Sequence, residues 1–295
     1  MKLYHASLNK RTLLAYNKRF PDRKVSVLRS FGTLDKTEKD FTHKHRDKID
    51  FLIFDSGTFS LNYAKGNSIR HITLENYINY MKLFGKYYDF YFNFDSDFRD
   101  IGFEINLYNM RTMEDYGLTP VPVVHDIWGN EIYYYIKNGY KRVALGSAQI
   151  RGLETLEFVM DIFKGTGIKI HLLGNTTFDF LANFPIHSCD SAMWARKGGF
   201  GFILYWNPKK LGKNKTDSIY MEEFIQTGND KKVIFSNYAF KTDLEAYLWN
   251  NFQLTHQDLM GNEGSYNKML VNMHYYVQLE DIINQIHVKK GFDTM

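Results

Sequence analysis

The sequence is poor in cysteine, with Cys189 alone among 295 residues. One thiol cannot form an intrachain disulfide, and it cannot build a structural zinc site that needs three or four cysteines. No stretch approaches the roughly 18 to 20 consecutive apolar residues of a membrane-spanning helix. The first seven residues lack the apolar segment of a secretory signal. We therefore expect a soluble, cytoplasmic protein with no membrane partner.

Net charge is also small, because 37 Lys and Arg face 33 Asp and Glu, which leaves +4. This excess alone does not indicate a nucleic-acid partner. Two nucleotide-binding signatures are missing, since no GxGxxG follows the first predicted strand and no GxxxxGK[ST] occurs. What the chain does have is a hydrophobic fraction of 44%, which suffices for a large core and excludes a mainly disordered chain.

Short apolar runs recur along the chain, and each is followed by a turn and a longer mixed segment. We predict strands at 24–28, 51–54, 90–94, 121–124, 142–145, 169–173 and 186–189, with an eighth at 231–236. Apolar residues three and four positions apart predict helices at 74–84, 153–163, 241–252 and 266–286. Serial β/α units of this kind form either an open doubly wound sheet or a barrel.

Polar residues follow directly after most of the predicted strands, and their position favours the barrel. A barrel gathers all such residues at one mouth, whereas an open sheet gathers only those near its switch point. We therefore predict an α/β fold, a (β/α)8 TIM barrel in residues 1–236. A short helical C-terminal segment, 237–295, is expected to pack on the barrel.

Two aspartates stand in similar contexts at strand ends, Asp55 in Asp-Ser-Gly and Asp190 in Asp-Ser-Ala. Two acids that face one sugar can divide glycosidic chemistry, because one attacks the anomeric carbon while the other moves protons. An aspartate after a strand is also common as a turn or capping residue, so that alternative stays open.

A base pocket is a second hypothesis. Asp95 follows an aromatic strand, and an ionised carboxylate can accept two parallel N–H bonds from the edge of a guanine-like base. His125 and the turn Gly146-Ser147 could complete such a pocket. An ordinary loop or helix cap explains each of these residues equally well.

The histidines raise the alternative of a metal-dependent barrel hydrolase. His5, His125, His171 and His187 lie in or beside predicted strands, as metal ligands of such enzymes do. The paired histidine ligand of an early strand is missing, because the segment 43–45 falls in a charged run. We assign no metal to the chain.

Taken together and in order, five segments resemble motifs of the tRNA-guanine transglycosylase superfamily, whose members exchange guanine in a polynucleotide for a 7-deazaguanine base. The resemblance spans roughly residues 50 to 205. The segments are Asp55-Ser56-Gly57-Thr58-Phe59-Ser60, Asn93-Phe94-Asp95, Ala144-Leu145-Gly146-Ser147, His171-Leu172-Leu173-Gly174, and the run from Cys189-Asp190-Ser191 through Trp194 and Arg196 to Gly199.

This resemblance implies a TIM barrel in which Asp190 is the covalent nucleophile and Asp55 is the general acid/base. It implies that a free 7-deazaguanine base is the co-substrate and that no further cofactor is needed. His125 lies near the position where the family commonly has a glutamine. The residues expected against the base are Ser56, Asp95, His125, Gly146 and Ser147.

The resemblance also bears on the polynucleotide. No cysteine follows Cys189, so we do not expect the C-terminal zinc subdomain of the tRNA-acting enzymes. In lacking this subdomain, the chain resembles the phage and bacterial branch of the family, which modifies DNA. Membership of that branch would place the protein in a host cytoplasm if a phage encodes it. We favour DNA, with tRNA as the alternative. Residues expected on the phosphates are Arg196, Lys197, Lys209 and Lys210.

Three other functions compete with base exchange. A metal-dependent hydrolase would hold a metal. A retaining glycosidase or nucleosidase would use the same two acids and release free base. A nucleic-acid-binding protein without activity would bind a polynucleotide and exchange nothing, and a solvated surface loop explains the basic residues without any polynucleotide.

Overall fold

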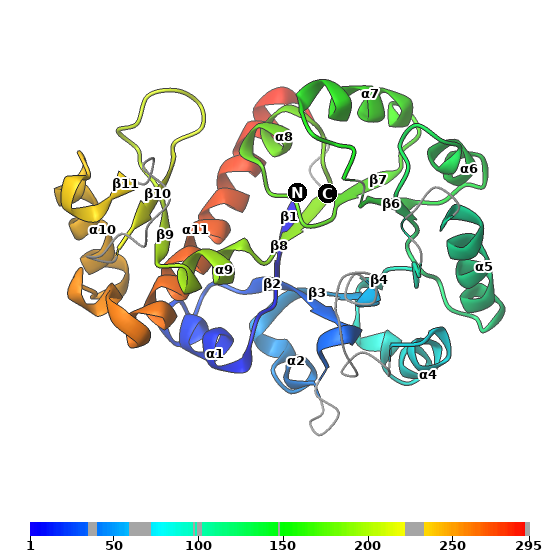
Figure 1. The fold of residues 1–295 in the computed structure, drawn as a ribbon, viewed down its shortest axis with the longest axis horizontal. Helices are drawn as coiled ribbons and strands as arrows, with labels where there is room; N and C mark the ends of the chain where they lie inside the picture. The colour runs from blue at the N-terminus through cyan, green and yellow to red at the C-terminus, as the bar shows by residue number, and fades with distance from the viewer. Residues whose placement is uncertain are drawn as a thin grey trace.

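A computed structural model describes residues 1–34, 40–58, 72–96, 98, 102–146, 148–221 and 233–292 of the chain. Its main feature is a sheet of eight strands in the order β4-β3-β2-β1-β8-β7-β6-β5, and every neighbouring pair is parallel. The sheet is curled, with helices along its outer side (Figure 1). The strands are β1 (Lys2–Ala6), β2 (Val25–Ser30), β3 (Ile49–Asp55), β4 (Phe90–Tyr91), β5 (Val123–Val124), β6 (Arg142–Leu145), β7 (Lys169–Leu172) and β8 (Ser188–Ser191).

Helices connect most successive strands, as parallel pairing requires. Three predicted helices have the expected bounds, α4 (Leu74–Phe84), α7 (Leu153–Phe163) and α10 (Lys241–Phe252), and each buries one apolar face. The other helices of this part are α1 (Lys10–Arg19), α2 (Phe41–Lys44), α5 (Gly102–Asp115), α6 (Glu131–Lys137), α8 (Phe178–Asn183) and α9 (Met193–Gly199). Short 3-10 turns are η1 (Phe31–Thr33), η2 (Arg46–Lys48) and η4 (Gly85–Tyr87).

The eighth strand of the sheet is not the predicted one. β1 occupies the place between β2 and β8, although the sequence did not suggest a strand at residues 2–6. The expected barrel strand at 231–236 is wrong. In its described part, β11 (Val233–Ile234) pairs with β10 (Thr216–Tyr220), outside the large sheet.

The two ends of the eight-stranded order, β4 and β5, come together at one point. Phe92 and Val121 form a parallel bridge just beyond β4 and just before β5. Val121 N donates to Tyr91 O over 2.8 Å, and Asn93 N donates to Val121 O over 2.9 Å. The structure is thus an α/β fold with a curled, all-parallel sheet, as a TIM-like barrel requires.

The inside of the curl is packed with side chains. Strand residues alternate between the two faces, so every second residue points inward. The inner cluster consists of Tyr4, Ala6, Leu28, Ile53, Phe92, Val121, Val123 and Ala144. The outward residues form the larger cluster beneath the helices, which includes Leu3, Phe54, Val143 and Leu172.

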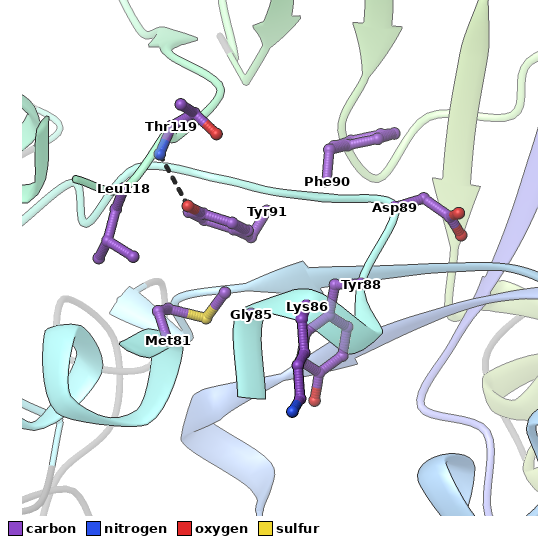
Figure 2. Close-up of a pocket in the computed structure, with 9 residues that line it drawn as sticks. All are labelled: Met81, Gly85, Lys86, Tyr88, Asp89, Phe90, Tyr91, Leu118 and Thr119. Carbon is purple, nitrogen blue, oxygen red and sulfur yellow. Dashed lines mark hydrogen bonds between the residues drawn. The ribbon is translucent and has the colours of Figure 1, made fainter. Parts of the chain in front are cut away.

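Two cavities, of about 310 and 650 Å³, lie at the amino ends of β4 to β6. They share Leu118 and Thr119 of the α5–β5 connection. In the smaller one, Thr119 N donates to the Tyr91 hydroxyl over 2.7 Å (Figure 2). Because these cavities lie at the opposite end from the carboxyl ends of the strands, they are separate from the predicted active-site residues.

A second, three-stranded sheet lies beside the large one (Figure 1). It contains β9 (Phe202–Trp206), β10 and β11, followed by η5 (Phe235–Asn237), α10 (Lys241–Phe252) and η6 (Gln257–Leu259). Residues of this sheet and of α10 share one apolar cluster. The boundary expected at 236 stays a prediction, and this cluster draws residues from both sides of it.

The last helix, α11 (Gly261–Lys290), joins the two sheets by packing on α9, β9 and β1. Its buried Asn272 accepts a bond from Leu204 N over 2.6 Å and donates to the carbonyls of Trp194 and Phe202 over 3.0 Å each. Neither α11 nor any other helix in the described part of the chain has an apolar stretch long enough to cross a bilayer.

Replacing Asn272 should therefore weaken the join between the sheets. Asn272→Ala removes all three hydrogen bonds in a buried place, which should cost about 2 to 4 kcal/mol of unfolding free energy. Gln285→Ala, an exposed change on the same helix, should cost less than about 0.5 kcal/mol. Urea unfolding measures both, and equal losses would contradict this role.

Candidate active site

The predicted catalytic and base-binding residues lie at the carboxyl ends of the parallel strands. Asp55 is the last residue of β3, and His125 and Gly146 directly follow β5 and β6. Asp190 was expected just after its strand but is the third residue of β8, which is shifted by two residues from the predicted range. Because parallel strands point the same way, these residues share one edge of the sheet.

Asp55 is held by its own loop and by the neighbouring strand. Its Oδ2 accepts bonds from Ser30 Oγ over 3.0 Å and from Gly57 N over 2.9 Å. Gly57 has φ +78°, and a Cβ there would lie 2.3 Å from Gly32 N, so only glycine fits between the two loops. The turn role that the sequence left open is real, and it leaves Oδ1 without a partner among the described residues.

Burial raises the pKa of Asp55 to about 6, against the two hydrogen bonds, which lower it. The charges of Asp190 and Asp95 raise it further. The three carboxylates are thus close enough to interact electrostatically. A carboxyl group with a pKa near 6 can both donate and accept a proton near neutral pH.

Asp190 is buried, and its Oδ1 accepts a bond from Gly174 N over 2.8 Å. His171 Nε2 lies 3.2 Å from the same oxygen. Burial lowers the pKa of His171, and Asp190 opposes this effect only in part. Asp190 therefore faces a neutral imidazole and a backbone N–H at the end of β7.

Asp95 and His125 form the next pair along the edge. His125 Nε2 lies 3.2 Å from Asp95 Oδ2, close enough for an ion pair, although the ring N–H is not well aligned with that oxygen. Asp95 Oδ1 accepts a bond from Asn93 Nδ2 over 2.6 Å. The ring of Phe98 stacks on His125 at 4.5 Å between centroids. Each oxygen of Asp95 thus already has a protein neighbour.

Glu131, the first residue of α6, holds the loop that carries His125. Its Oε2 accepts a bond from His125 N over 2.7 Å. Burial raises the pKa of Glu131 to about 7, although the backbone N–H bond and the charge of His125 lower it. Burial lowers the pKa of His125, but Asp95 and Glu131 outweigh burial and keep it above its ordinary value.

The other expected base contacts have different surroundings. Ser56 is buried, and its hydroxyl bonds to Thr58 Oγ1 over 3.1 Å within the same loop. Gly146 donates its N–H to Val124 O over 3.0 Å, so that amide serves the sheet. A Cβ on Gly146 would lie 2.8 Å from Val123 and 3.5 Å from the His125 ring, which explains the glycine. Ser147 lies outside the described residues.

Three of the four basic residues expected on phosphates have protein partners. Lys197 Nζ donates to Ser218 Oγ over 3.1 Å. Lys209 pairs with Asp243 at 2.7 Å, and Lys210 pairs with Asp217 at 2.9 Å. Arg196 of α9 is exposed, and no described residue bonds its guanidinium.

The remaining histidines of the metal hypothesis do not gather at this edge. Both ring nitrogens of His5 lie near carbonyls, those of Ser26 and Met273, at 3.2 and 3.3 Å. Burial lowers the pKa of His187 to about 3, and the charge of Arg142 lowers it further. Within the described ranges, no three His, Cys, Asp or Glu side chains are close enough to hold a metal ion.

Sequence reasoning missed several residues that bond the predicted acids or their neighbouring histidines. Ser30 and Glu131 stand at element ends, where an acid or hydroxyl beside a predicted strand could have drawn attention. Asn93 and His171 lie in the segments that carry the family resemblance, but the resemblance assigned neither a role, and His171 was considered only as a metal ligand. Ser188 precedes the predicted nucleophile by two positions and so shares its face of the strand.

Comparisons with protein-family models, curated proteins and solved structures gave no match for this chain. The residues and their geometry therefore carry the functional argument.

Asp55 should give the protein a distinctive pH dependence. Its pKa is higher in the folded chain, about 6, than in the unfolded chain, roughly 3.9, so its stabilising effect is complete below pH 4 and is lost as pH rises through 6. Asp55→Asn cannot lose a proton. Relative to the wild type, the variant should gain about 2 kcal/mol between pH 4 and 7.

Urea unfolding of both proteins at several pH values measures this difference in unfolding free energy. The contributions of the other titrating groups are common to both proteins and cancel. Adding Asp190→Asn to both proteins should move the transition to lower pH, because one of the charges that raise the pKa of Asp55 is removed. A difference that stays constant from pH 4 to 7 would contradict the raised pKa.

Proposed function

We propose that the protein is a base-exchange transglycosylase, which replaces guanine in a polynucleotide by a 7-deazaguanine base. The observation that carries this proposal is the pair of acids Asp55 and Asp190. They come from separate strands and lie at one edge of the sheet, and the charge of Asp190 adds to burial in raising the pKa of Asp55. The resemblance of the surrounding motifs to guanine transglycosylases supports the same chemistry.

In the first half of the reaction, a carboxylate oxygen of Asp190 gives an electron pair to C1′ of the flipped guanine nucleotide. The glycosidic bond breaks, and its electron pair leaves with guanine, which takes a proton from Asp55. In the second half, a 7-deazaguanine base loses a proton to Asp55 and attacks C1′, so Asp190 leaves. A pKa near 6 suits both proton transfers of Asp55.

Base recognition falls to the pair Asp95 and His125. Each oxygen of Asp95 keeps a second lone pair, so the carboxylate can still accept N–H bonds from guanine. The raised pKa of His125 favours a charged ring, which would donate to a carbonyl oxygen of the base.

We also propose that the eight strands close into a complete (β/α)8 barrel. The bridge between Phe92 and Val121 would then be its seam, and the carboxyl ends of all eight strands would surround one mouth. A closed barrel gives Asp55 and Asp190 the fixed separation that two-step glycosidic chemistry requires. DNA remains the favoured polynucleotide, because no cysteine after Cys189 is present to build the zinc subdomain of the tRNA-acting enzymes.

Asp190→Asn should abolish exchange of labelled guanine in DNA, by at least about a thousandfold, because an amide oxygen is a poor nucleophile. Incubation with DNA and no incoming base should trap a covalent protein–DNA adduct in the wild type only. Asp179→Asn, the same change at an exposed position on α8, should behave as the wild type. Substantial exchange by Asp190→Asn would contradict the nucleophile, and release of guanine without incorporation would favour a nucleosidase.

Arg196 should contribute most among the four basic residues to polynucleotide binding, because no described residue neutralises its charge. Arg196→Ala should weaken binding several-fold and lower the slope of log affinity against log salt by about one. Lys209→Ala should have a smaller effect, since Lys209 already pairs with Asp243 at 2.7 Å. Salt titrations of DNA binding compare the two, and an equal or larger effect at Lys209 would reverse this assignment.

A further inference from the structure

Two polar groups in the described part of the chain contact the Asp190 carboxylate, and both contact the same oxygen. Gly174 N donates to Oδ1 over 2.8 Å, and His171 Nε2 lies 3.2 Å from Oδ1. No bond from the described part of the chain ends on Oδ2. The two oxygens of one carboxylate are therefore inequivalent before any substrate arrives.

The other side of the His171 ring is also occupied. Nδ1 lies 2.8 Å from the hydroxyl oxygen of Ser188, which is fully buried in the same strand as Asp190. Three aromatic rings surround the imidazole, with centroids at 5.0 Å for Phe92, 6.0 Å for Tyr4 and 6.1 Å for Phe90. The ring is fully buried, so packing and two polar contacts fix its plane.

These contacts select one tautomer of His171. An ionised carboxylate has only acceptors, so the proton between the two groups must be on Nε2. Burial lowers the pKa of His171, which keeps the ring neutral and leaves Nδ1 without a proton. Nδ1 then accepts the hydroxyl hydrogen of Ser188. Two hydrogen bonds thus run in series: Ser188 Oγ–H donates to Nδ1, and Nε2–H donates to Asp190 Oδ1. Both bonds can form together only with the donors placed in this way.

We propose that His171 is a positioning residue, which together with Ser188 and Gly174 holds Oδ1 of Asp190 and leaves Oδ2 as the oxygen that attacks the sugar. This inference rests on the proposed role of Asp190 as nucleophile. Oδ2 supplies the electron pair that bonds to C1′, and the departing guanine takes its proton from Asp55. The Nε2 proton stays on His171 throughout, so His171 orients the nucleophile and transfers nothing.

Ser188→Ala tests this arrangement, because without the hydroxyl Nδ1 loses its hydrogen-bond partner and only Asp190 and the packed rings hold the imidazole. We expect kcat for base exchange to fall about 10- to 100-fold, as when other orienting groups are removed, while KM for the polynucleotide changes less than about threefold. Cys189→Ala is the matched control, since Cys189 is equally buried but points to the opposite face of the strand. It should leave kcat within about twofold.

Nitrogen-15 NMR of the His171 ring gives a readout that does not require activity. In the wild type at pH 7 to 8, Nδ1 should be the unprotonated nitrogen and Nε2 the protonated one. Ser188→Ala should shift the Nδ1 resonance, because that nitrogen loses its hydrogen-bond donor. A charged ring, or a proton on Nδ1 in the wild type, would overturn the positioning role even if Asp190→Asn abolishes exchange. Unchanged kcat in Ser188→Ala would do the same.

The two proposals fail in different ways. If Asp190→Asn keeps full exchange activity while the NMR spectra show the expected tautomer, the nucleophile assignment fails, and with it the attacking oxygen, although the hydrogen-bonded chain stands. If Asp190→Asn is inactive and the tautomer is the other one, base exchange stands and only the positioning role is lost.

Discussion

The pairing of β1 with β8 is the contact on which both the fold and the site depend. A strand from the beginning of the chain lies between β2 and β8, and its register sets Leu3 beside Cys189 and Tyr4 beside Asp190. The last helix fixes this strand, because Glu280 of α11 accepts a bond from Leu3 N over 2.7 Å and pairs with Lys2 at 3.3 Å. The position of Asp190 along the sheet thus depends on β1 and on the helix α11 that holds β1.

Burial of acids at the edge of the sheet carries a free-energy cost, and the neighbours of each acid decide how the cost is met. Asp95 lies beside His125, whose pKa is above its ordinary value, so the two side chains can form an ion pair. Asp190 has a neutral histidine and a backbone N–H. Among the described residues, Asp55 has only a hydroxyl and a backbone N–H as donors, so burial, with two other acids nearby, raises its pKa to about 6.

The sequence predicted those parts of this arrangement that are local. The helices α4 and α7 have the expected bounds because the apolar spacing that predicts each helix also forms the face that it buries. The first strand was missed because five residues are too few to show a clear periodicity. The run at 233–234 was assigned to the wrong sheet because local composition does not indicate which strand a segment pairs with. The acids themselves were found by their position after apolar runs. Ser30, which bonds Asp55, was not found, and neither were Ser188 and Glu131, which bond His171 and His125. Each of these contacts depends on strand register or on a loop closing back over the edge.

The hydrogen bonds of the three acids also divide them into two kinds. Asp55 receives both of its bonds on Oδ2, and Asp190 has both of its contacts on Oδ1. In each case the other oxygen has no partner in the described chain, as an oxygen that exchanges a proton or attacks a carbon requires. Asp95 instead has one neighbour on each oxygen, Asn93 and His125. A carboxylate fixed at both oxygens is poorly placed to attack but well placed to hold a base in one orientation, which is the division of roles that base exchange needs.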